Sequence, residues 1–306
     1  MSFDGPRDDR PTKNQRREAA RLKARQLRED QKKKERRNRV LLQGGIIVVS
    51  LAIVTIVVLA ITSSIHPAGP GPKNMASDGI LIGAGMEPVS TPALQPKATP
   101  VASKTDETGT VASIRIYLDY LCPYCGQFEK TNGEQIKQWV TSGAATVEIH
   151  PISLLTSKSA GTQYSLRAAN AAACVANYSP DDFYAFNQEL FKDQPEEGSA
   201  GLDDSQIKKL VKTAGVTTDV SKINDCIDDL TFKSWVLDAT DRALTGPLPN
   251  ASIPSVTGTP TVLVNGKQYL GSLDDPKEFA SFVLQAAGET YSTSTATPTP
   301  KPTAAS

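Results

Sequence analysis

The sequence predicts an α/β fold in which a helical domain interrupts a sheet. Alternating apolar residues indicate strands at Val111–Tyr120 and Ala145–Ile152, and the residues between them have the apolar spacing of a helix. From about residue 158 to about 246 the pattern is helical, and strand signals return only near residue 261. This order of strand, helix, strand, helices, hairpin and helix is typical of an α/β sheet with an inserted helical domain.

The helices have local start and stop signals. The first is expected over about 124–140, because Phe128, Ile136 and Trp139 share an apolar face and Gly143 follows as a stop. Helices of the insert are expected at 162–176, from Ser179 onward, and at 204–214, 218–228 and 231–244.

The end of the body shows a hairpin and a last helix. Thr261–Val264 and Gln268–Leu270 flank an Asn-Gly dipeptide, which favours a two-residue hairpin turn. An Asp-Asp-Pro cap at 274–276 predicts a helix that ends at Ala287, with Gly288 just past its end.

The charges divide the chain into unlike parts, although the formal net charge of the 306 residues is zero. Residues 1–39 hold fifteen Lys or Arg and seven Asp or Glu, and the apolar run 40–62 follows without a charge. As a helix, 23 residues span about 35 Å, enough for a hydrocarbon core of about 30 Å. We therefore expect a single-pass anchor in the lipid bilayer at the cell membrane. The positive-inside rule places the N-terminus in the cytoplasm and the catalytic body outside the cytoplasm.

A cleaved signal peptide is the alternative interpretation of the apolar run. Signal peptides have an apolar region of about 7 to 15 residues, so the length of this run favours an uncleaved anchor. We expect the basic cytoplasmic segment 1–39 to lie at the inner membrane surface. Because the segment adjoins a membrane helix, lipid headgroups are a simpler partner for it than nucleic acid.

Two segments lack any helical or strand period. Residues 63–110 and 289–306 are dense in Pro, Gly, Ser, Thr and Ala. They predict a flexible linker at 63–110 and a disordered tail at 289–306. The folded body is then about 111–288, a normal size for one domain.

The pair Cys122 and Cys125 stands where the first strand meets the first helix. Unpaired N–H groups and the helix dipole stabilise an anion at this point, so the pKa of Cys122 should fall and its thiolate should be reactive. Cys125 is one turn away, close enough to form a disulfide with Cys122. In the dipeptide between them, Pro123 fixes φ without needing a partner for an N–H group, and Tyr124 follows it.

Other uses of the pair are less consistent with the sequence. A structural zinc site needs about four ligands, but Cys174 and Cys226 each stand alone, His66 lies in the linker, and His150 is expected at the surface or a sheet edge. A purely structural disulfide in so tight a ring would remove little chain entropy. We therefore expect redox activity without a metal or cofactor, and no glycine motif indicates a phosphate-binding loop.

The two remaining cysteines, Cys174 and Cys226, fall in predicted helices of the insert. In an oxidising environment outside the membrane they are expected to form a structural disulfide. Such a bridge would stabilise the fold by roughly 4 kcal/mol in the chain-entropy model. Two buried free thiols, or a pair that shuttles electrons, are the alternatives.

Three segments together resemble the DsbA-like branch of the thioredoxin superfamily. They are Tyr120–Phe128 (YLCPYCGQF), His150–Leu155 (HPISLL) and Gly258–Val262 (GTPTV). The likeness is closest to membrane-anchored actinobacterial members and covers about residues 111–288.

The resemblance implies a thioredoxin-like core and disulfide donation to newly exported, reduced proteins. It implies a cis peptide between Thr259 and Pro260 beside the CxxC pair, where the backbone of Thr259 can pair with an extended substrate. It also implies a quinone-linked membrane enzyme that reoxidises the pair, either DsbB-like or vitamin-K-epoxide-reductase-like (VKOR-like). Many thioredoxin-like proteins carry a buried acid six residues before the first cysteine, but this chain has Ile116 there, and Asp119 is expected on the opposite face of the strand.

Two further functions stay open at this point. A disulfide reductase or isomerase would use the same two cysteines in the reduced state. A non-catalytic thioredoxin-like binding module of the cell envelope would present the Thr259-Pro260 groove to a partner, and the intact CPYC sequence argues against it.

Overall fold

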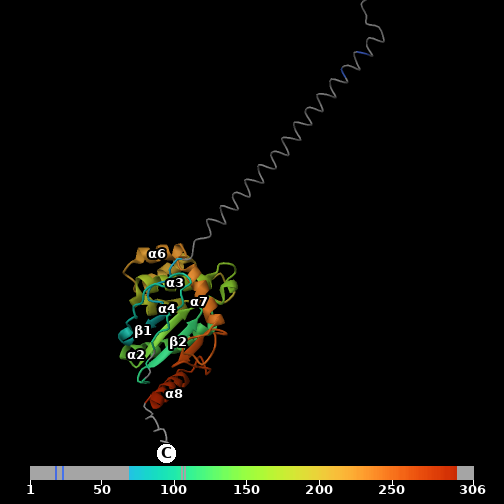
Figure 1. The fold of residues 1–306 in the computed structure, drawn as a ribbon. Helices are drawn as coiled ribbons and strands as arrows, with labels where there is room; N and C mark the ends of the chain where they lie inside the picture. The colour runs from blue at the N-terminus through green and yellow to red at the C-terminus, as the bar shows by residue number, and fades with distance from the viewer. Residues whose placement is uncertain (1–17, 19–22, 24–68, 105, 107, 295–306) are drawn as a thin grey trace, which may run out of the picture. The chain divides into compact units, whose positions relative to one another are not determined.

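The computed structural model describes residues 69–104, 106 and 108–294, with Glu18 and Lys23 near the N-terminus (Figure 1). The predicted basic segment, the predicted anchor at 40–62 and residues 295–306 of the predicted tail otherwise lie outside these residues. Among the residues that are described, no helix is both long and apolar enough to cross a bilayer.

The body is built on a five-stranded sheet in the order β1-β3-β2-β4-β5. The central strand β2 pairs in parallel with β3 on one side and antiparallel with β4 on the other. β1 pairs antiparallel with β3, and β5 pairs antiparallel with β4. The strands are β1 (Ile80–Ile82), β2 (Ala112–Leu118), β3 (Ala145–Pro151), β4 (Thr261–Val264) and β5 (Lys267–Gln268).

Two helices cover one face of the sheet, α2 (Pro123–Ser142) and α8 (Pro276–Ser294). Successive side chains of β2 point to opposite faces of the sheet. Ile114, Ile116 and Leu118 therefore lie on one face, where they are buried in the main hydrophobic core together with residues of these helices. Phe128 of α2 and Phe279 of α8 meet edge to face, with ring centroids 5.2 Å apart. The helix that begins with the cysteine pair is therefore fixed to the sheet by its buried side.

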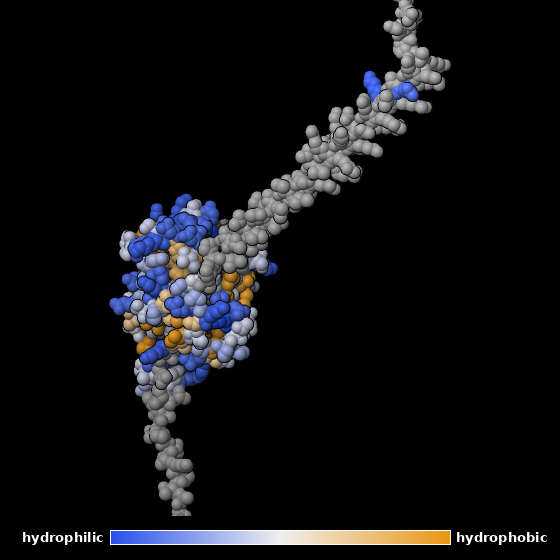
Figure 2. Space-filling model, turned by 45° about the horizontal axis from the view of Figure 1, so that its top comes forward, coloured by the Kyte–Doolittle hydropathy of each residue, from blue (hydrophilic) through white to orange (hydrophobic). Residues whose placement is uncertain are grey.

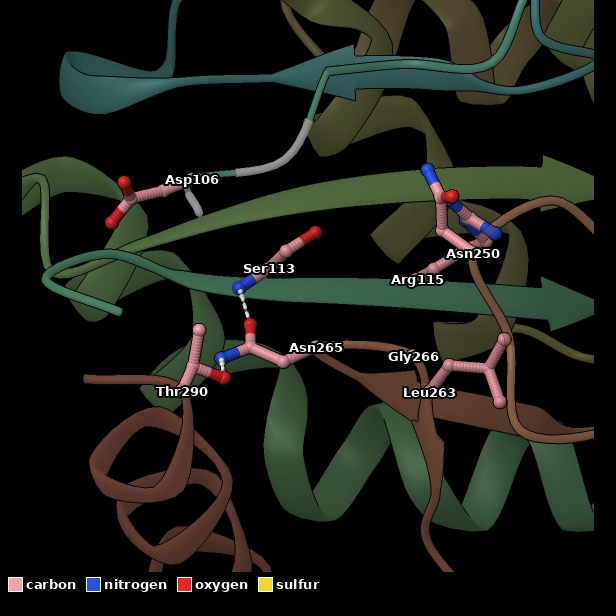
Figure 3. A pocket seen from close by; sticks show the side chains of 8 residues that line it. All are labelled: Asp106, Ser113, Arg115, Asn250, Leu263, Asn265, Gly266 and Thr290. Carbon is pink, nitrogen blue, oxygen red and sulfur yellow. Dashed lines mark hydrogen bonds between the residues drawn. The ribbon is translucent and has the colours of Figure 1, made fainter. Parts of the chain in front are cut away.

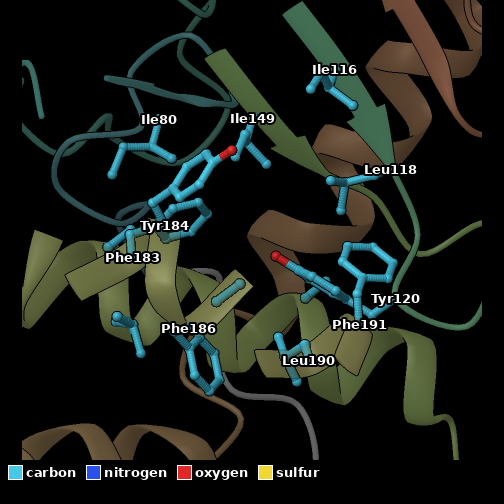
Figure 4. Close-up of a cluster of buried hydrophobic side chains, with 14 of the residues drawn as sticks. Ile80, Ile116, Leu118, Tyr120, Ile149, Phe183, Tyr184, Phe186, Leu190 and Phe191 are labelled. Atoms are coloured by element: carbon cyan, nitrogen blue, oxygen red, sulfur yellow. The ribbon is translucent and has the colours of Figure 1, made fainter. Parts of the chain in front are cut away.

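The predicted insert is a bundle of five helices around α3. Alanine fills much of α3 and is buried along it, which allows its neighbours to approach closely. The aromatic side chains of α4 belong to the same buried cluster as the sheet residues, and Figure 4 shows Tyr184 reaching toward Ile149 of β3. The helices are α3 (Tyr164–Tyr178), α4 (Phe183–Lys192), α5 (Asp204–Thr213), α6 (Val220–Asp228) and α7 (Lys233–Thr245). On the face in Figure 2 hydrophilic residues predominate, as expected of a body whose large apolar side chains are inside.

The N-terminal arm, residues 69–104, corrects the prediction of a flexible linker over 63–110. It contains β1, and Met75, Ile80 and Ile82 are at most 1% exposed. Three residues of strand are too short to show a period in the sequence. Their order comes instead from the free edge of β3, which supplies backbone hydrogen bonds and an apolar surface.

Polar side chains also attach the arm to the body. The hydroxyls of Ser77 and Ser103 donate to the buried carboxylate of Glu148 at 2.6 and 2.5 Å. Asp78 accepts two hydrogen bonds from the guanidinium of Arg242 in α7, each 2.7 Å long. The arm is thus an integral part of the folded body.

The hairpin and the last helix differ slightly from their predicted limits. The Asn-Gly turn is present, but β5 is Lys267–Gln268, and α8 continues through Gly288 to Ser294 instead of ending at Ala287. Asn265 explains the longer helix, because its amide donates to the Thr290 hydroxyl at 3.0 Å and its oxygen accepts from the Ser113 N–H at 2.8 Å (Figure 3). The pocket in Figure 3 lies at the start of β2, the opposite end from the cysteine pair.

Candidate active site: a dithiol at the start of α2

Cys122 caps the N-terminus of α2, and Pro123 is the first helical residue. The Cys122 carbonyl accepts the N–H groups of Cys125 and Gly126 at 3.0 and 3.2 Å, which begins the helical hydrogen-bond pattern. Both thiols are free and nearly buried, with exposed fractions of 4% for Cys122 and 2% for Cys125. The strand-to-helix placement predicted for the pair is confirmed.

The two thiols differ sharply in acidity. The pKa of Cys122 is lowered to about 6, mainly by a hydrogen bond from the Cys125 thiol. The Thr259 side chain and the backbone N–H groups of Cys125 and Tyr124 lower this pKa further, whereas burial raises it. Burial, followed by the interaction with Cys122, raises the pKa of Cys125 well above its ordinary value. Near neutral pH, Cys122 is therefore the thiolate and Cys125 the thiol.

The predicted cis peptide between Thr259 and Pro260 is present beside the pair. The Cys122 thiol lies 3.2 Å from the Thr259 carbonyl oxygen. Cys122 and Thr259 are 137 positions apart in the sequence. They meet because β4 runs antiparallel to β2, with Thr261 opposite Tyr117. Tyr124 is 62% exposed, so the dipeptide between the cysteines faces outward.

No carboxylate occupies the position six residues before Cys122, where Ile116 is buried in the core. Asp119 is fully buried, but its carboxylate accepts the N–H groups of Leu121 and Leu155 and the hydroxyl of Ser165. Asp119 reaches the Cys125 sulfur through its backbone N–H, at 3.5 Å. Its side chain therefore holds the loop before the dithiol in shape.

The prediction that His150 lies at the surface or at a sheet edge is wrong, because β3 lies between β1 and β2 in the sheet. Its exposed fraction is 3%, its ring stacks on Tyr117 at 4.4 Å, and its Nε2 is 3.3 Å from a Glu148 oxygen. The arm causes this burial, because Gly79 lies against the ring so closely that an added Cβ would be 2.6 Å from it. Within 69–104, 106 and 108–294, no group of three or more His, Cys, Asp or Glu residues is arranged to hold a metal ion.

Cys174 and Cys226 form the predicted disulfide, which joins α3 to α6 inside the insert. Asn170 supports this junction, since its side chain donates to the Cys226 carbonyl and accepts the Phe232 N–H. The bridge excludes the alternative of two free thiols in the insert.

Glu129, which the sequence analysis did not single out, is buried one turn after Cys125 on the same helix. Its Oε1 atom has no hydrogen-bond partner, and burial raises its pKa to about 7. Helical spacing could have revealed it, because it shares the apolar side of α2 with Phe128 and Ile136.

We expect Glu129→Gln to flatten the pH dependence of stability. The native state holds a proton on Glu129 that the unfolded state releases above its ordinary pKa of 4.5, so the free energy of unfolding should fall as the pH rises from about 5 to about 8. The difference amounts to roughly 3 kcal/mol. Urea unfolding of both proteins at pH 5 and pH 8 measures it, with exposed Glu134→Gln on the same helix as control. Equal slopes in the wild type and Glu129→Gln would contradict the expectation.

The fold and the dithiol beside a cis-proline define a thiol–disulfide oxidoreductase. A family model described as thioredoxin matches residues 107–284, and the chain belongs to this family. The structure is similar to the reduced form of the disulfide bond oxidoreductase DsbG from Mycobacterium tuberculosis, with 27% identity, a TM-score of 0.50, and coverage of 75% of this chain and 97% of that one.

Two other relatives are informative within limits. Oxidised BdbD from Bacillus subtilis is 20% identical with a TM-score of 0.50, covers 73% of this chain and 100% of its own, and supports the fold alone. The serine/threonine-protein kinase PknE of Mycobacterium tuberculosis is 30% identical over 134 residues, which are 42% of this chain. The chain spans about a quarter of the length of that kinase.

Proposed function

We propose that this protein donates disulfide bonds to exported proteins outside the cytoplasm through Cys122 and Cys125. The contrast between an acidic Cys122 and a weakly acidic Cys125 carries the proposal. A thiolate that is stable near neutral pH favours the reduced pair, and a favoured reduced form makes the oxidised form a strong oxidant. The similarity to a disulfide bond oxidoreductase is consistent with this chemistry.

The exchange begins with the pair as a disulfide. A substrate thiolate attacks the Cys122 sulfur, the bond between the two cysteines breaks, and Cys125 leaves with the electron pair and takes up a proton. A second substrate thiolate then attacks the substrate sulfur of the mixed disulfide, and Cys122 leaves as a thiolate. The substrate gains a disulfide, and the protein is left with a reduced pair.

The Thr259 backbone lies where an extended substrate would pass the reacting sulfur. Tyr124 lies between the two cysteines in the sequence and is exposed, so it is available to a peptide bound at Cys122. We therefore assign Tyr124 and the Thr259-Pro260 peptide to substrate binding.

A second partner must accept two electrons to restore the disulfide. We propose a quinone-linked membrane enzyme of DsbB-like or VKOR-like type, with the quinone as oxidant. The apolar run 40–62 would hold both proteins in one membrane, with basic residues 1–39 on the cytoplasmic side.

The reduction potential of the full chain in detergent tests the direction of exchange. Equilibration with glutathione should give a value nearer to about −120 mV, typical of a strong disulfide donor, than to about −270 mV, typical of thioredoxin. A potential near that of thioredoxin would contradict disulfide donation and support the alternative of a disulfide reductase. A Cys122→Ser protein that fully replaced the wild type in cells would favour the binding module instead.

A further inference from the structure

Gln194 connects the helical insert to the turn that carries the dithiol. It lies just beyond the end of α4 and is half-buried. Its side-chain Nε2 donates to the Cys122 carbonyl at 2.8 Å and to the Tyr120 carbonyl at 3.1 Å. One amide group thus holds the carbonyl groups of Tyr120 and Cys122, the two residues that flank Leu121.

Gly126 gives an independent indication that this contact matters. A Cβ added at Gly126 would lie 2.0 Å from the Gln194 Oε1 and 3.0 Å from its Cδ. Gly126 is inside α2 and does not have a positive φ, so its backbone conformation does not require glycine. Glycine in a helix interior costs roughly 1 kcal/mol relative to alanine. Its presence here is explained by the space that the Gln194 side chain occupies.

We propose that Gln194 is a positioning residue that fixes the dithiol turn from the side of the helical insert, and that Gly126 makes room for it. The proposal rests on exchange through Cys122, but not on the direction in which the electrons flow.

The position of the Cys122 backbone determines how its sulfur meets the groups that stabilise the thiolate. These groups are the Cys125 thiol, the Thr259 side chain and the backbone N–H groups of Cys125 and Tyr124. The Cys122 carbonyl already accepts two helical N–H groups, and the Gln194 amide is its third donor. Loss of that donor frees the turn to shift, so the thiolate should lose part of its stabilisation and the reduced pair should become less favoured.

A set of variants of the full chain in detergent tests the proposal. Gln194→Met keeps the bulk of the side chain without the donors, and Gln194→Ala removes both. We expect each to raise the pKa of the Cys122 thiol and to lower the equilibrium constant for oxidation of glutathione by roughly three- to tenfold, the effect of losing about one hydrogen bond. Thiolate absorbance and equilibration with glutathione measure the two quantities. Exposed Gln138→Ala on α2 is the matched control and should change neither.

Gly126→Ala should reproduce the rise in the pKa of Cys122 with no substitution at Gln194 itself. The new methyl group expels the amide, so the pKa of Cys122 should rise as in Gln194→Ala. In the double variant Gly126→Ala/Gln194→Ala, the new methyl group has free space. The second substitution should therefore cause no further rise in the pKa of Cys122. The double variant should unfold at a higher denaturant concentration than Gln194→Ala alone, because alanine favours the helix.

Two results would overturn the proposal. Gln194→Met and Gln194→Ala could lower stability but leave the pKa of Cys122 and the glutathione equilibrium unchanged. Gln194 would then stabilise the packing of the insert without affecting the dithiol. If the effects of Gly126→Ala and Gln194→Ala on the pKa of Cys122 added up in the double variant, the two residues would act independently. A wild-type potential near that of thioredoxin would refute disulfide donation, yet the difference between the wild type and Gln194→Ala would still decide the role of Gln194.

Discussion

Cys122→Ser is expected to slow disulfide transfer to a reduced substrate by a thousandfold or more. Of the two thiols, Cys122 has its pKa lowered to about 6 and lies beside the Thr259 carbonyl, which we assign to substrate binding. A serine hydroxyl cannot form the mixed disulfide through which exchange proceeds. Cys125→Ser should behave differently, because the reactive Cys122 sulfur stays in place. Oxidised glutathione should form a mixed disulfide with Cys122 and release reduced glutathione, and this mixed disulfide should accumulate because no neighbouring thiol can displace it.

Stoichiometric oxidation of a reduced peptide by the fully oxidised protein, followed by mass spectrometry, measures the rate. Incubation of Cys125→Ser with oxidised glutathione traps the mixed disulfide. Ser142→Ala, at the far end of α2, is the control and should leave the rate unchanged. A Cys122→Ser protein that kept a tenth of the wild-type rate would contradict the assignment, because this variant has no internal disulfide to transfer.

Removal of the N-terminal arm is expected to lower the free energy of unfolding by about 3 kcal/mol or more. A chain that starts at residue 106 lacks Met75, Ile80 and Ile82, each fully buried in the native body. Burial of each such side chain contributes roughly 1.5–3 kcal/mol, part of which is offset by the entropy of ordering the arm. The truncated chain would also leave the edge of β3 unpaired, which promotes association between chains.

Denaturant unfolding of chains that start at residues 69 and 106 measures this difference. Ile80→Ala in the full chain is the point-mutation counterpart, with an expected loss of roughly 2–4 kcal/mol. Val89→Ala is its control, because Val89 is in the same arm but 43% exposed. Equal stability of the two truncated chains would show that the arm is not needed by the fold.

Local patterns account for the parts of the fold that were predicted well. β2, β3 and α2 are long enough to show a period of 2 or 3.6, and the Asn-Gly turn specifies its hairpin without help from other segments. The cysteine pair was placed at the start of α2 because a strand and a helix meet there in the sequence itself. The cis peptide at Thr259 and the function of the site came from the family resemblance.

Distant contacts account for what was missed. The residues of β1 show no period, and only pairing with β3 orders them. His150 stands before a proline like an edge residue, and the arm that buries it belongs to a segment about 70 positions earlier. Gln194 is a polar residue in a loop, and its contact with the Cys122 carbonyl spans 72 positions.

The sequence by itself determined most strands and helices of residues 111–288, the reactive pair and its place at a helix N-terminus. These depend on hydrogen bonds and apolar spacing among residues close along the chain. Tertiary structure alone decided which edge of the sheet the arm covers, how buried Glu129 and His150 are, and which side chain holds the Cys122 carbonyl. Burial and electrostatic environment depend on all the atoms nearby in space, and folding brings most of those atoms from distant parts of the chain.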